Sequence, residues 1–312
     1  MDLRIFTEPQ QGATYEDLLA VAKATEHAGF NGFFRSDHFL KMGDVTGLPG
    51  SSHAWLTLAA LGRETSTIRL GTLVSPATFY RPGPLAIMVA QADAMSGGRI
   101  EFGFGAGWYE AEHEAYGLEF PSLGGRFDLM EEYLEQITGL WAIDEGQTYC
   151  NDGKFHQFTN SPALPKPVQR PGPPIIIGGR GPKRTPSMVA RYAAEFNLPF
   201  AGTEDLGPTI GRVKEACVAI DRDPEELVYS AALVMAMGTS EDEIGRRAAS
   251  IGRDVTELRT NGAAGTPQEV IDKLGQYAEA GISRVYLQVL DLSDIDHVRQ
   301  AGEELIEAVS DL

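Results

Sequence analysis

The sequence of 312 residues predicts an α/β fold of the (β/α)8 TIM barrel class, with insertions at the C-terminal mouth of the barrel. Short apolar runs alternate along the chain with segments whose apolar residues recur at helical spacing, as they do in a barrel of parallel strands and covering helices. The length and the 43% hydrophobic content also suit one large core. We therefore expect a single domain over residues 1–312.

Each apolar run is expected to form a strand, and each periodic segment a helix. The strands are expected at residues 3–6, 32–36, 68–74, 100–104, 175–177, 195–198, 227–234 and 284–289. The helices are expected at residues 15–28, 53–64, 85–96, 126–141, 182–193, 206–220 and 268–280, with a last helix running to residue 312. Strands joined by helices in this way are parallel, and their crossovers are right-handed. An open, doubly wound sheet is the alternative.

Two spacings are too long for a bare repeat, and we expect them to be insertions, at about residues 106–174 and 235–265. Insertions at the C-terminal mouth commonly carry the chemistry of barrel enzymes. The first insertion contains six prolines, which predict a stiff extended loop rather than added sheet. An Ala-Gly pair followed by an apolar residue recurs in Glu26-His27-Ala28-Gly29-Phe30 and Glu279-Ala280-Gly281-Ile282, which indicates glycine-terminated helices with a structural role.

The charge of the chain is unevenly distributed. Residues 153–194 contain no Asp or Glu and carry a charge of +7, although the whole chain has a net charge of −18. At the centre of this segment an apolar strand runs through Gly178, Gly179 and Gly181 into a helix. Backbone N–H groups and the positive helix end would converge there, which predicts a phosphate site. The alternative is a glycine-rich loop with solvated basic residues.

Composition argues against several classes of function. A pI near 4.7 disfavours general binding to nucleic acid. We expect no membrane partner, because no stretch is long and apolar enough to span a bilayer and no leader precedes the first strand. Cys150 and Cys217 show no metal-ligand spacing, which favours a reducing, cytoplasmic location. The segment from Glu110 to Glu114 also lacks a metal-binding spacing, so we expect an acidic, solvated helix start and no metal site.

Two further motifs could carry chemistry. Asp37 and His38 follow the second strand, where a histidine can exchange a proton and the adjacent carboxylate can orient it. A buried histidine bonded to backbone is the equal alternative. The run from Gly103 to Trp108 does not fit a dinucleotide fingerprint. Its glycines would let the backbone approach a flat ring, with Trp108 as a wall, although tight packing at the barrel rim explains them as well.

Taken together, these motifs resemble those of the bacterial-luciferase-like superfamily. The resemblance runs nearly end to end through Ser36-Asp37-His38-Phe39, Leu70-Gly71-Thr72-Leu73-Val74, Phe102-Gly103-Phe104-Gly105-Ala106-Gly107-Trp108-Tyr109-Glu110-Ala111-Glu112-His113, Arg126-Phe127-Asp128 and Ile177-Gly178-Gly179. Within the superfamily, the chain is most similar to oxidoreductases that use the deazaflavin coenzyme F420. This resemblance implies a (β/α)8 barrel that holds the ring system at its C-terminal mouth, in a homodimer or larger assembly.

The resemblance also implies a role for each matching position. Asp37 and His38 would be the acid/base pair beside the reactive ring, and Leu73-Val74 would be joined by a non-prolyl cis peptide behind that ring. Ala106, Gly107 and Trp108 would contact the ring or its chain. The phosphate would bind at Gly178, Gly179, Arg180 and Gly181, with Arg170, Lys183 and Arg184 as candidates for the anionic tail. Trp108 replaces an acid of the related sugar-phosphate dehydrogenases, which favours a more apolar substrate.

Three functions follow as hypotheses. The first is an F420-dependent oxidoreductase that moves a hydride between the deazaflavin C5 and a small organic substrate, either an alcohol/carbonyl pair or an activated alkene. The second keeps the fold but uses reduced FMN and oxygen, as luciferase-like monooxygenases do. The third is a cofactor-binding barrel without turnover. The charge of +7 favours the phosphodiester and glutamate tail of F420 over the single phosphate of FMN.

Overall fold

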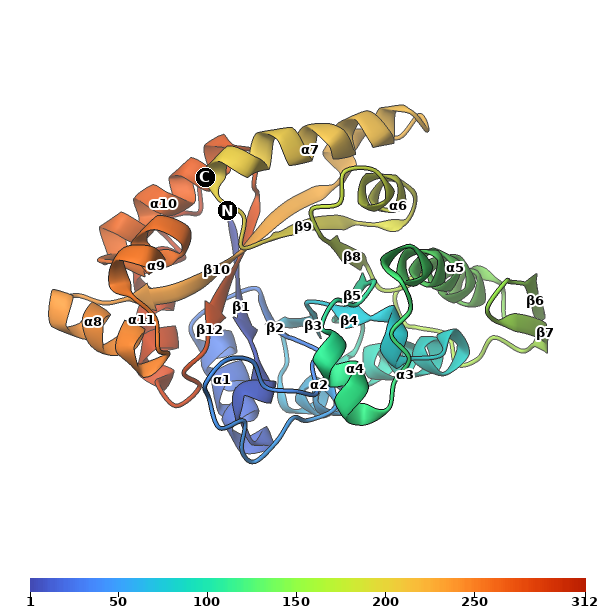
Figure 1. Ribbon diagram of the computed structural model, residues 1–312, viewed down its shortest axis with the longest axis horizontal. Coiled ribbons are helices and arrows are strands. Elements are labelled where there is room, and N and C mark those ends of the chain that lie inside the picture. The colour runs from blue at the N-terminus through green and yellow to red at the C-terminus, as the bar shows by residue number, and fades with distance from the viewer.

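The computed structural model describes all 312 residues, and its centre is a closed barrel of eight parallel strands (Figure 1). The barrel strands are β1 (Asp2–Thr7), β2 (Gly32–Arg35), β3 (Arg69–Thr72), β5 (Ile100–Gly105), β8 (Ile175–Gly178), β9 (Glu195–Pro199), β10 (Val228–Met237) and β12 (Arg284–Val289). They pair in this order, and β12 closes the barrel on β1 with Asp2 opposite Arg284. The predicted TIM barrel is confirmed, and the open doubly wound sheet is wrong.

Eight helices surround the barrel, one after each strand. They are α1 (Tyr15–His27), α2 (Ala54–Glu64), α3 (Pro82–Ser96), α5 (Leu123–Ala142), α6 (Arg184–Tyr192), α7 (Thr203–Val218), α10 (Pro267–Glu279) and α11 (Ile295–Leu305). Local sequence explains several of their ends. Both α1 and α10 begin with a capping box, formed by Thr14 with Asp17 and by Thr266 with Glu269. Helix α3 ends at Gly97, whose φ of 70° closes the last turn in the left-handed conformation.

The first insertion differs in part from its prediction. It contains helix α4 (Glu110–Tyr116) and an antiparallel hairpin of β6 (Tyr149–Asp152) and β7 (Gln157–Ser161). The expectation that it would add no sheet is therefore wrong. All six prolines follow β7, so they shape the irregular segment 162–174 and do not interfere with the hairpin. The hairpin lies beyond α5 at one end of the molecule (Figure 1).

The second insertion contains α8 (Glu241–Ser250), α9 (Val255–Asn261) and the short strand β11 (Ala263–Gly265), which extends the sheet beside the end of β10. A two-residue strand, β4 (Ser75–Pro76), pairs with the end of β5. Three short 3-10 helices, η1 (Pro9–Gln11), η2 (Ala77–Phe79) and η3 (Pro224–Glu226), complete the set. The second insertion lies on the side of the barrel opposite the hairpin (Figure 1).

The barrel separates two kinds of core. A cluster of 59 buried apolar residues fills the space between the strands and the helices. The barrel interior has its own small apolar cluster, consisting of Phe6, Phe34, Ile176, Ala232 and Tyr286. Below it, near the N-terminal ends of the strands, Arg4 Nη1 donates to Glu101 Oε2 over 2.5 Å, and Arg284 pairs with Glu195. These buried ion pairs close the bottom of the barrel and leave its other end for a site.

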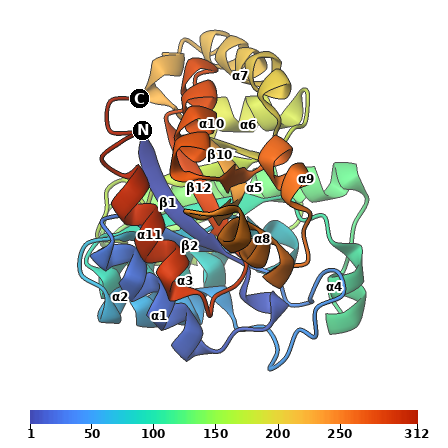
Figure 2. The same cartoon turned by 90° about the vertical axis from the view of Figure 1, so that its left-hand side faces the viewer.

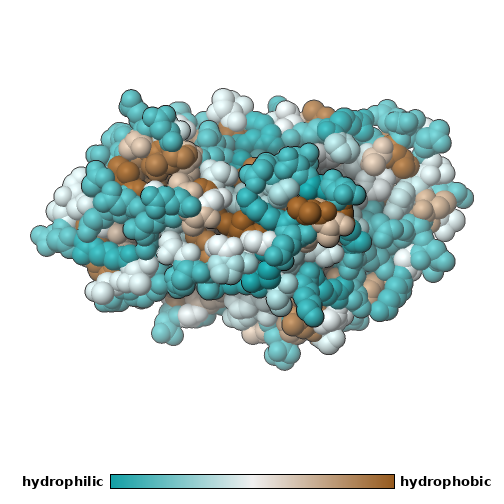
Figure 3. Space-filling view, turned by 90° about the horizontal axis from the view of Figure 1, so that it is seen from above, coloured by the Kyte–Doolittle hydropathy of each residue, from teal (hydrophilic) through white to brown (hydrophobic).

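The two chain ends meet on the outside of the barrel, where the Met1 ammonium donates to the carbonyls of Val309 and Leu312 at 2.6 and 2.7 Å (Figure 2). The face shown in Figure 3 is mostly hydrophilic, with apolar residues in small separate groups. No helix combines the length and the apolar character of a membrane span.

Candidate active site

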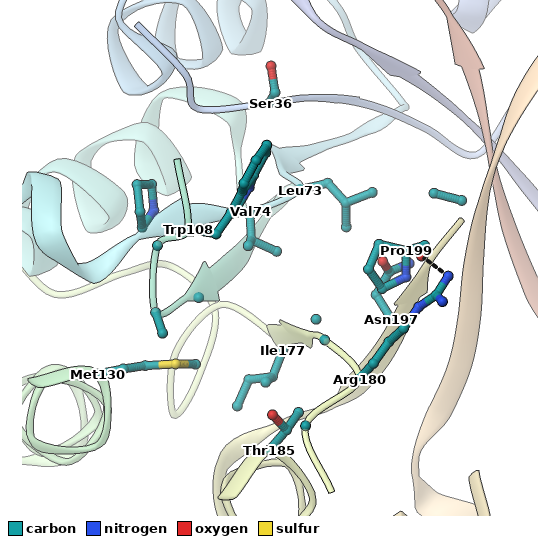
Figure 4. A pocket seen from close by; sticks show the side chains of 18 of the residues that line it. Ser36, Leu73, Val74, Trp108, Met130, Ile177, Arg180, Thr185, Asn197 and Pro199 are labelled. Atoms are coloured by element: carbon teal, nitrogen blue, oxygen red, sulfur yellow. Dashed lines mark hydrogen bonds between the residues drawn. The ribbon is translucent and has the colours of Figure 1, made fainter. Parts of the chain in front are cut away.

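A cavity of about 350 Å³ opens at the C-terminal ends of the barrel strands. Figure 4 shows side chains from the ends of β3, β8 and β9 and from the loop after β5 facing this space, which we call the reaction cavity. Its walls are glycine backbone, apolar side chains and a few polar groups. The C-terminal end of a TIM barrel is where enzymes of this fold place their chemistry, so the position alone marks a candidate active site.

Ten of the fourteen residues for which the sequence predicts a role in the site line the reaction cavity. They are His38, Leu73, Val74, Ala106, Gly107, Trp108, Gly178, Gly179, Arg180 and Gly181. Asp37, Arg170, Lys183 and Arg184 do not line it. The structure thus brings together residues from four separate strand ends, in keeping with the sequence-based expectation that the strands end at one common mouth.

His38 is held by a carboxylate that the sequence analysis did not select. Its Nδ1 lies 2.9 Å from Glu112 Oε1, and the second oxygen of Glu112 accepts the backbone N–H of Phe39 at 3.0 Å. Glu112 is only 1% exposed. The other ring nitrogen, Nε2, has no hydrogen-bond partner in the protein, while the ring itself lines the cavity. A histidine fixed at Nδ1 and free at Nε2 can exchange a proton with a bound molecule.

Asp37 faces away from this pair. Its Oδ2 accepts hydrogen bonds from Ser75 Oγ at 2.5 Å and from the Tyr80 hydroxyl at 2.7 Å, and the residue is buried. The prediction that Asp37 orients His38 is therefore wrong, because the Asp37 carboxylate bonds Ser75 and Tyr80 whereas His38 bonds Glu112. Burial, reinforced by the negative charge of Asp37, raises the pKa of Tyr80 well above its ordinary value. Asp37 fastens the loop behind the cavity.

The expectation of a solvated helix start from Glu110 to Glu114 is wrong in part. The segment does start helix α4, but Glu112 and His113 are buried rather than solvated. His113 Nε2 lies 2.7 Å from Thr78 Oγ1, and its Nδ1 lies 2.8 Å from the carbonyl of Tyr109. Both side chains are buried because α4 packs across two loops: Glu112 contacts the loop after β2, and His113 contacts the loop after β3. Glu112 thus enters the site through the first insertion.

One wall of the cavity is backbone and small side chains. The peptide between Leu73 and Val74 is cis, as the resemblance implied, and both residues line the cavity. A Cβ on Gly105 would lie 2.8 Å from Val74 Cγ2, and one on Gly107, whose φ is +82°, would lie 2.7 Å from Thr78 Oγ1. Glycine suits these positions because a side chain would collide with Val74 or Thr78. The resulting flat surface suits a planar ring.

Trp108 stands at the edge of this wall. Its indole is 63% exposed, stacks on Tyr109 with ring centroids 5.3 Å apart, and meets the His38 ring edge to face at 5.7 Å. A large aromatic face left open beside the free histidine nitrogen provides an apolar contact for whatever molecule reaches that nitrogen.

The loop between β8 and α6 has the features of an anion site. Gly179 has a φ of +139°, and a Cβ on Gly181 would meet Thr185 Oγ1 at 2.7 Å. The backbone N–H groups of Arg180 and Gly181 have no acceptor within the protein. Free N–H groups at the start of a helix bind phosphate well. The residues present therefore fit a phosphate group at this loop.

The segment of residues 153–194, which we call the basic run, contributes fewer cations to the site than its charge of +7 suggested. Most of its cations are engaged elsewhere, and the partners are Asp128 for Lys154 and Arg184, Glu131 for Arg184 and Arg191, Glu145 for Arg170, and the carbonyl of Leu140 for Lys166. Arg180 alone of the seven lines the cavity, and it also contacts Asp205 at 3.5 Å. The charge of +7 therefore overstates the free positive charge at the cavity, because Asp128 and Glu131 of α5 pair with Lys154, Arg184 and Arg191.

Several lining residues were missed by the sequence analysis. They are Glu8, Ser36, Glu112, Phe127, Met130, Thr185, Asn197 and Phe200. Glu8 follows β1 and Phe200 follows β9, so a survey of every residue after a strand would have found these two. Glu112 comes from α4, which lies outside the barrel repeat, and Met130 comes from the barrel helix α5; only the packing of these two helices places the side chains at the cavity. No local pattern marks such positions.

A (β/α)8 barrel with a flat-walled cavity, a histidine at its edge and a phosphate loop defines a class of barrel oxidoreductases that bind flavin-like rings. The family model described as luciferase-like monooxygenase matches residues 1–256, and the chain belongs to this family. This confirms the resemblance and the expectation of a luciferase-like oxidoreductase.

Several relatives have been named. An F420-dependent glucose-6-phosphate dehydrogenase of Mycolicibacterium smegmatis is 26% identical over 304 residues, which cover 86% of each chain. The oxygenase component of a flavin-dependent trigonelline monooxygenase of Acinetobacter baylyi is 27% identical over 217 residues. That match covers 69% of this chain but only 57% of the relative.

Solved structures share the fold. An F420-dependent secondary alcohol dehydrogenase in complex with an F420-acetone adduct superposes with a TM-score of 0.84 at 21% identity, covering 99% of this chain and 98% of the other. The oxygenating constituent of an FMN-bound 3,6-diketocamphane monooxygenase of Pseudomonas putida gives a TM-score of 0.78 at 16% identity, with 98% of both chains covered. At these identities the likeness establishes the fold.

Proposed function

We propose that this protein is an F420-dependent oxidoreductase that transfers a hydride between the deazaflavin C5 and a small organic substrate. The observation that carries the proposal is the His38 ring, fixed at Nδ1 by buried Glu112 and free at Nε2 beside the flat wall of the cavity. Relatives named as F420-dependent and matched over most of both chains support the choice of cofactor.

The chain's own residues would divide the work as follows. Leu73, Val74 and the glycines after β5 would support a planar ring, and the loop from Gly178 to Gly181 would hold its phosphate. When bound, the deazaflavin would supply a carbon that accepts or gives a hydride. His38 Nε2 would take the hydroxyl proton of an alcohol as the hydride leaves the substrate carbon, or return the proton in the reverse direction. Glu112 would keep the imidazole oriented and stabilise its charged form.

An FMN-dependent monooxygenase is the second candidate. It is favoured by the relative named as a flavin-dependent monooxygenase, and by the finding that four of the seven cations in the basic run contact α5. The free N–H groups of Arg180 and Gly181 suit the phosphate of either cofactor. The phosphate loop therefore does not distinguish the two candidate functions. They differ in which cofactor binds more tightly and in whether turnover consumes oxygen.

Titration of the purified protein with F420 and with FMN, at the same ionic strength, tests the proposal. We expect F420 to bind at least about 10-fold more tightly, seen as a change in deazaflavin fluorescence. Secondary alcohols should then reduce bound F420 without consuming oxygen. Tighter binding of FMN together with oxygen-dependent turnover would establish the second candidate instead.

Replacement of His38 tests whether the barrel is a catalyst or a binding protein without turnover. We expect His38→Ala to lower turnover about 100-fold or more, because proton transfer loses its partner, while the affinity for F420 stays within about 2-fold. Single-turnover absorbance of bound F420 measures the first quantity, and fluorescence titration measures the second. An unchanged rate would remove His38 from the mechanism.

A further inference from the structure

A second, larger cavity of about 1280 Å³ adjoins the reaction cavity. It lies between the start of the chain and the second insertion, with walls from η1, the loop at Met42–Val45, α8, α9 and the segment after β12. Glu8 and Phe200 line both cavities. These two residues form the junction, and a molecule that reaches His38 from the larger cavity passes them.

The larger cavity has an acidic wall. Its charged lining residues are Glu8, Asp17, Asp44, Glu257, Asp291 and Arg253. Arg253 is the only cation, and it is bound at 2.6 Å to Glu257 within α9 and the turn before it. None of the other four carboxylates forms an ion pair with any side chain. An anionic substrate such as a sugar phosphate would meet repulsion from this wall and find no free cation there.

Glu8 is half-buried at the junction, whereas Asp44 is exposed. Its Oε2 accepts a hydrogen bond from the amide Nε2 of Gln11 over 3.4 Å, and the side chain of Gln288 is a second neutral hydrogen-bond partner. Burial raises the pKa of Glu8, and the positive form of nearby His38 would lower it, but the His38 ring is held by Glu112 and makes no ion pair with Glu8. A half-buried carboxylate without a cation is costly, and a positive group placed beside it would remove that cost.

Phe200 gives the junction its second feature. It follows β9 with a φ of +50°, and its ring is 42% exposed. Its carbonyl accepts a hydrogen bond from Arg180 Nη2, and its N–H donates to the carbonyl of Ala232 at 3.2 Å, so the backbone is fixed on both sides. An aromatic face and a carboxylate that line the same opening can together recognise an alkylammonium group, by cation–π attraction and by charge.

We propose that the junction of Glu8 and Phe200 binds a positively charged, ammonium-type group of the substrate. The substrate of this barrel would then be an amino- or ammonium-substituted alcohol or carbonyl compound. The proposal rests on the proposed function only in placing the reacting carbon near His38. The charged group would lie toward the larger cavity, and Asp44 and Asp291 would attract it at the entrance.

Three matched probes test the charge preference by calorimetric titration of the full chain, with and without F420. The cationic probe is 1-(trimethylammonio)propan-2-ol, the neutral probe is its carbon isostere 4,4-dimethylpentan-2-ol, and the anionic probe is 2-hydroxypropane-1-sulfonate. We expect the cation to bind about 10-fold more tightly than the isostere at low salt, and the anion to bind most weakly. Equal binding of the cation and the isostere would overturn the proposal.

Two variants assign the preference to the junction. Glu8→Gln should weaken binding of the cation about 10-fold and leave the isostere within about 2-fold, whereas Phe200→Leu should weaken the cation by a smaller factor. Glu304→Gln, on the exposed face of α11, makes the same charge change away from the cavity and should alter neither. If Glu8→Gln weakens both probes equally, or if Glu304→Gln has the same effect, the junction is not the recognition site.

The outcome is independent of the cofactor assignment. Binding of the probes is measured without turnover, so a protein that rejects F420 but prefers the cation would refute the proposed function and leave this inference standing. Thermal melting shows whether each variant is folded. If Glu8→Gln fails to fold, the wild-type preference at increasing NaCl decides, because attraction by the carboxylates must shrink as salt screens it. A preference that does not change with salt would contradict the proposal.

Discussion

Glu112 controls the one imidazole that reaches the reaction cavity. Its carboxylate is buried, contacts His38 Nδ1 at 2.9 Å and accepts the N–H of Phe39. We predict that Glu112→Gln, which keeps the size of the side chain, lowers turnover about 10- to 100-fold. An amide still bonds the Phe39 N–H, but it no longer stabilises the charged imidazole. Single-turnover rates over a range of pH, compared with F420 affinity, measure the effect.

Glu114 provides the matched control for this change. It lies two residues further along α4, is exposed, and its carboxylate forms no hydrogen bond or ion pair. Glu114→Gln alters the net charge by the same amount and should leave the pH profile as in the wild type. If the two variants behave alike, the effect of Glu112 is one of overall charge, and Glu112 does not position His38.

Of the pair His38 and Glu112, only His38 could be predicted as a site residue from the sequence. His38 could be predicted because a titratable residue directly after a strand must lie at the barrel mouth. Its partner could not, because the contact joins residues 74 positions apart and depends on how α4 packs. Asp37 was selected because it adjoins His38 in the sequence, yet its carboxylate bonds Ser75 and Tyr80 in the loop after β3.

The helix α5 determines how much of the basic run is available to a ligand. Asp128 and Glu131 on α5 bind Arg184, while Arg180 remains at the cavity. We predict that Arg180→Gln weakens binding of F420 about 10-fold, because a charge-assisted contact to an anion is lost. Arg184→Gln should leave the affinity within about 2-fold, since its guanidinium is already occupied. Fluorescence titration at two salt concentrations compares the pair, and equal losses would show that the whole run binds the cofactor.

At the scale of elements, the barrel strands and their covering helices could be predicted from the sequence, whereas the hairpin in the first insertion could not. All eight barrel strands were located from apolar runs, and the helices from periodicity and capping residues, because each element buries a face that its own sequence encodes. The hairpin of β6 and β7 was missed because its strands are short and half exposed, so they carry no buried face. The net charge of the basic run overstated its free cations, because a count along the chain ignores Asp128 and Glu131, which α5 places beside the run.

Acidification acts on the whole molecule in two opposing ways. With a net charge of −18, protonation of exposed carboxylates reduces repulsion within the folded chain as the pH falls toward 4. His297 on α11 acts in the other direction. It is 4% exposed, and its Nε2 accepts the N–H of Met237 at the end of β10 over 3.1 Å. Burial, reinforced by the positive charge of Arg247, lowers the pKa of His297 to about 4.

The sign of the His297 effect follows from comparing its two states. In the unfolded chain the imidazole takes up its proton near pH 6.5, whereas in the folded chain it stays neutral until about pH 4. The stability it contributes is therefore complete above about pH 6.5 and is lost as the pH falls from there to about 4, to a total of about 3 kcal/mol. Within this window the unfolded state binds the extra proton.

We therefore predict that His297→Gln, which keeps an acceptor for the Met237 N–H, flattens the dependence of the free energy of unfolding on pH. Urea unfolding at pH 7.5, 6.5, 5.5 and 4.5 should show the wild type losing about 3 kcal/mol relative to the variant, whatever their difference at pH 7.5. His27→Gln, at the exposed end of α1, should follow the wild-type curve. If the wild type and His297→Gln give parallel curves, the contact between α11 and β10 is not what makes the barrel sensitive to acid.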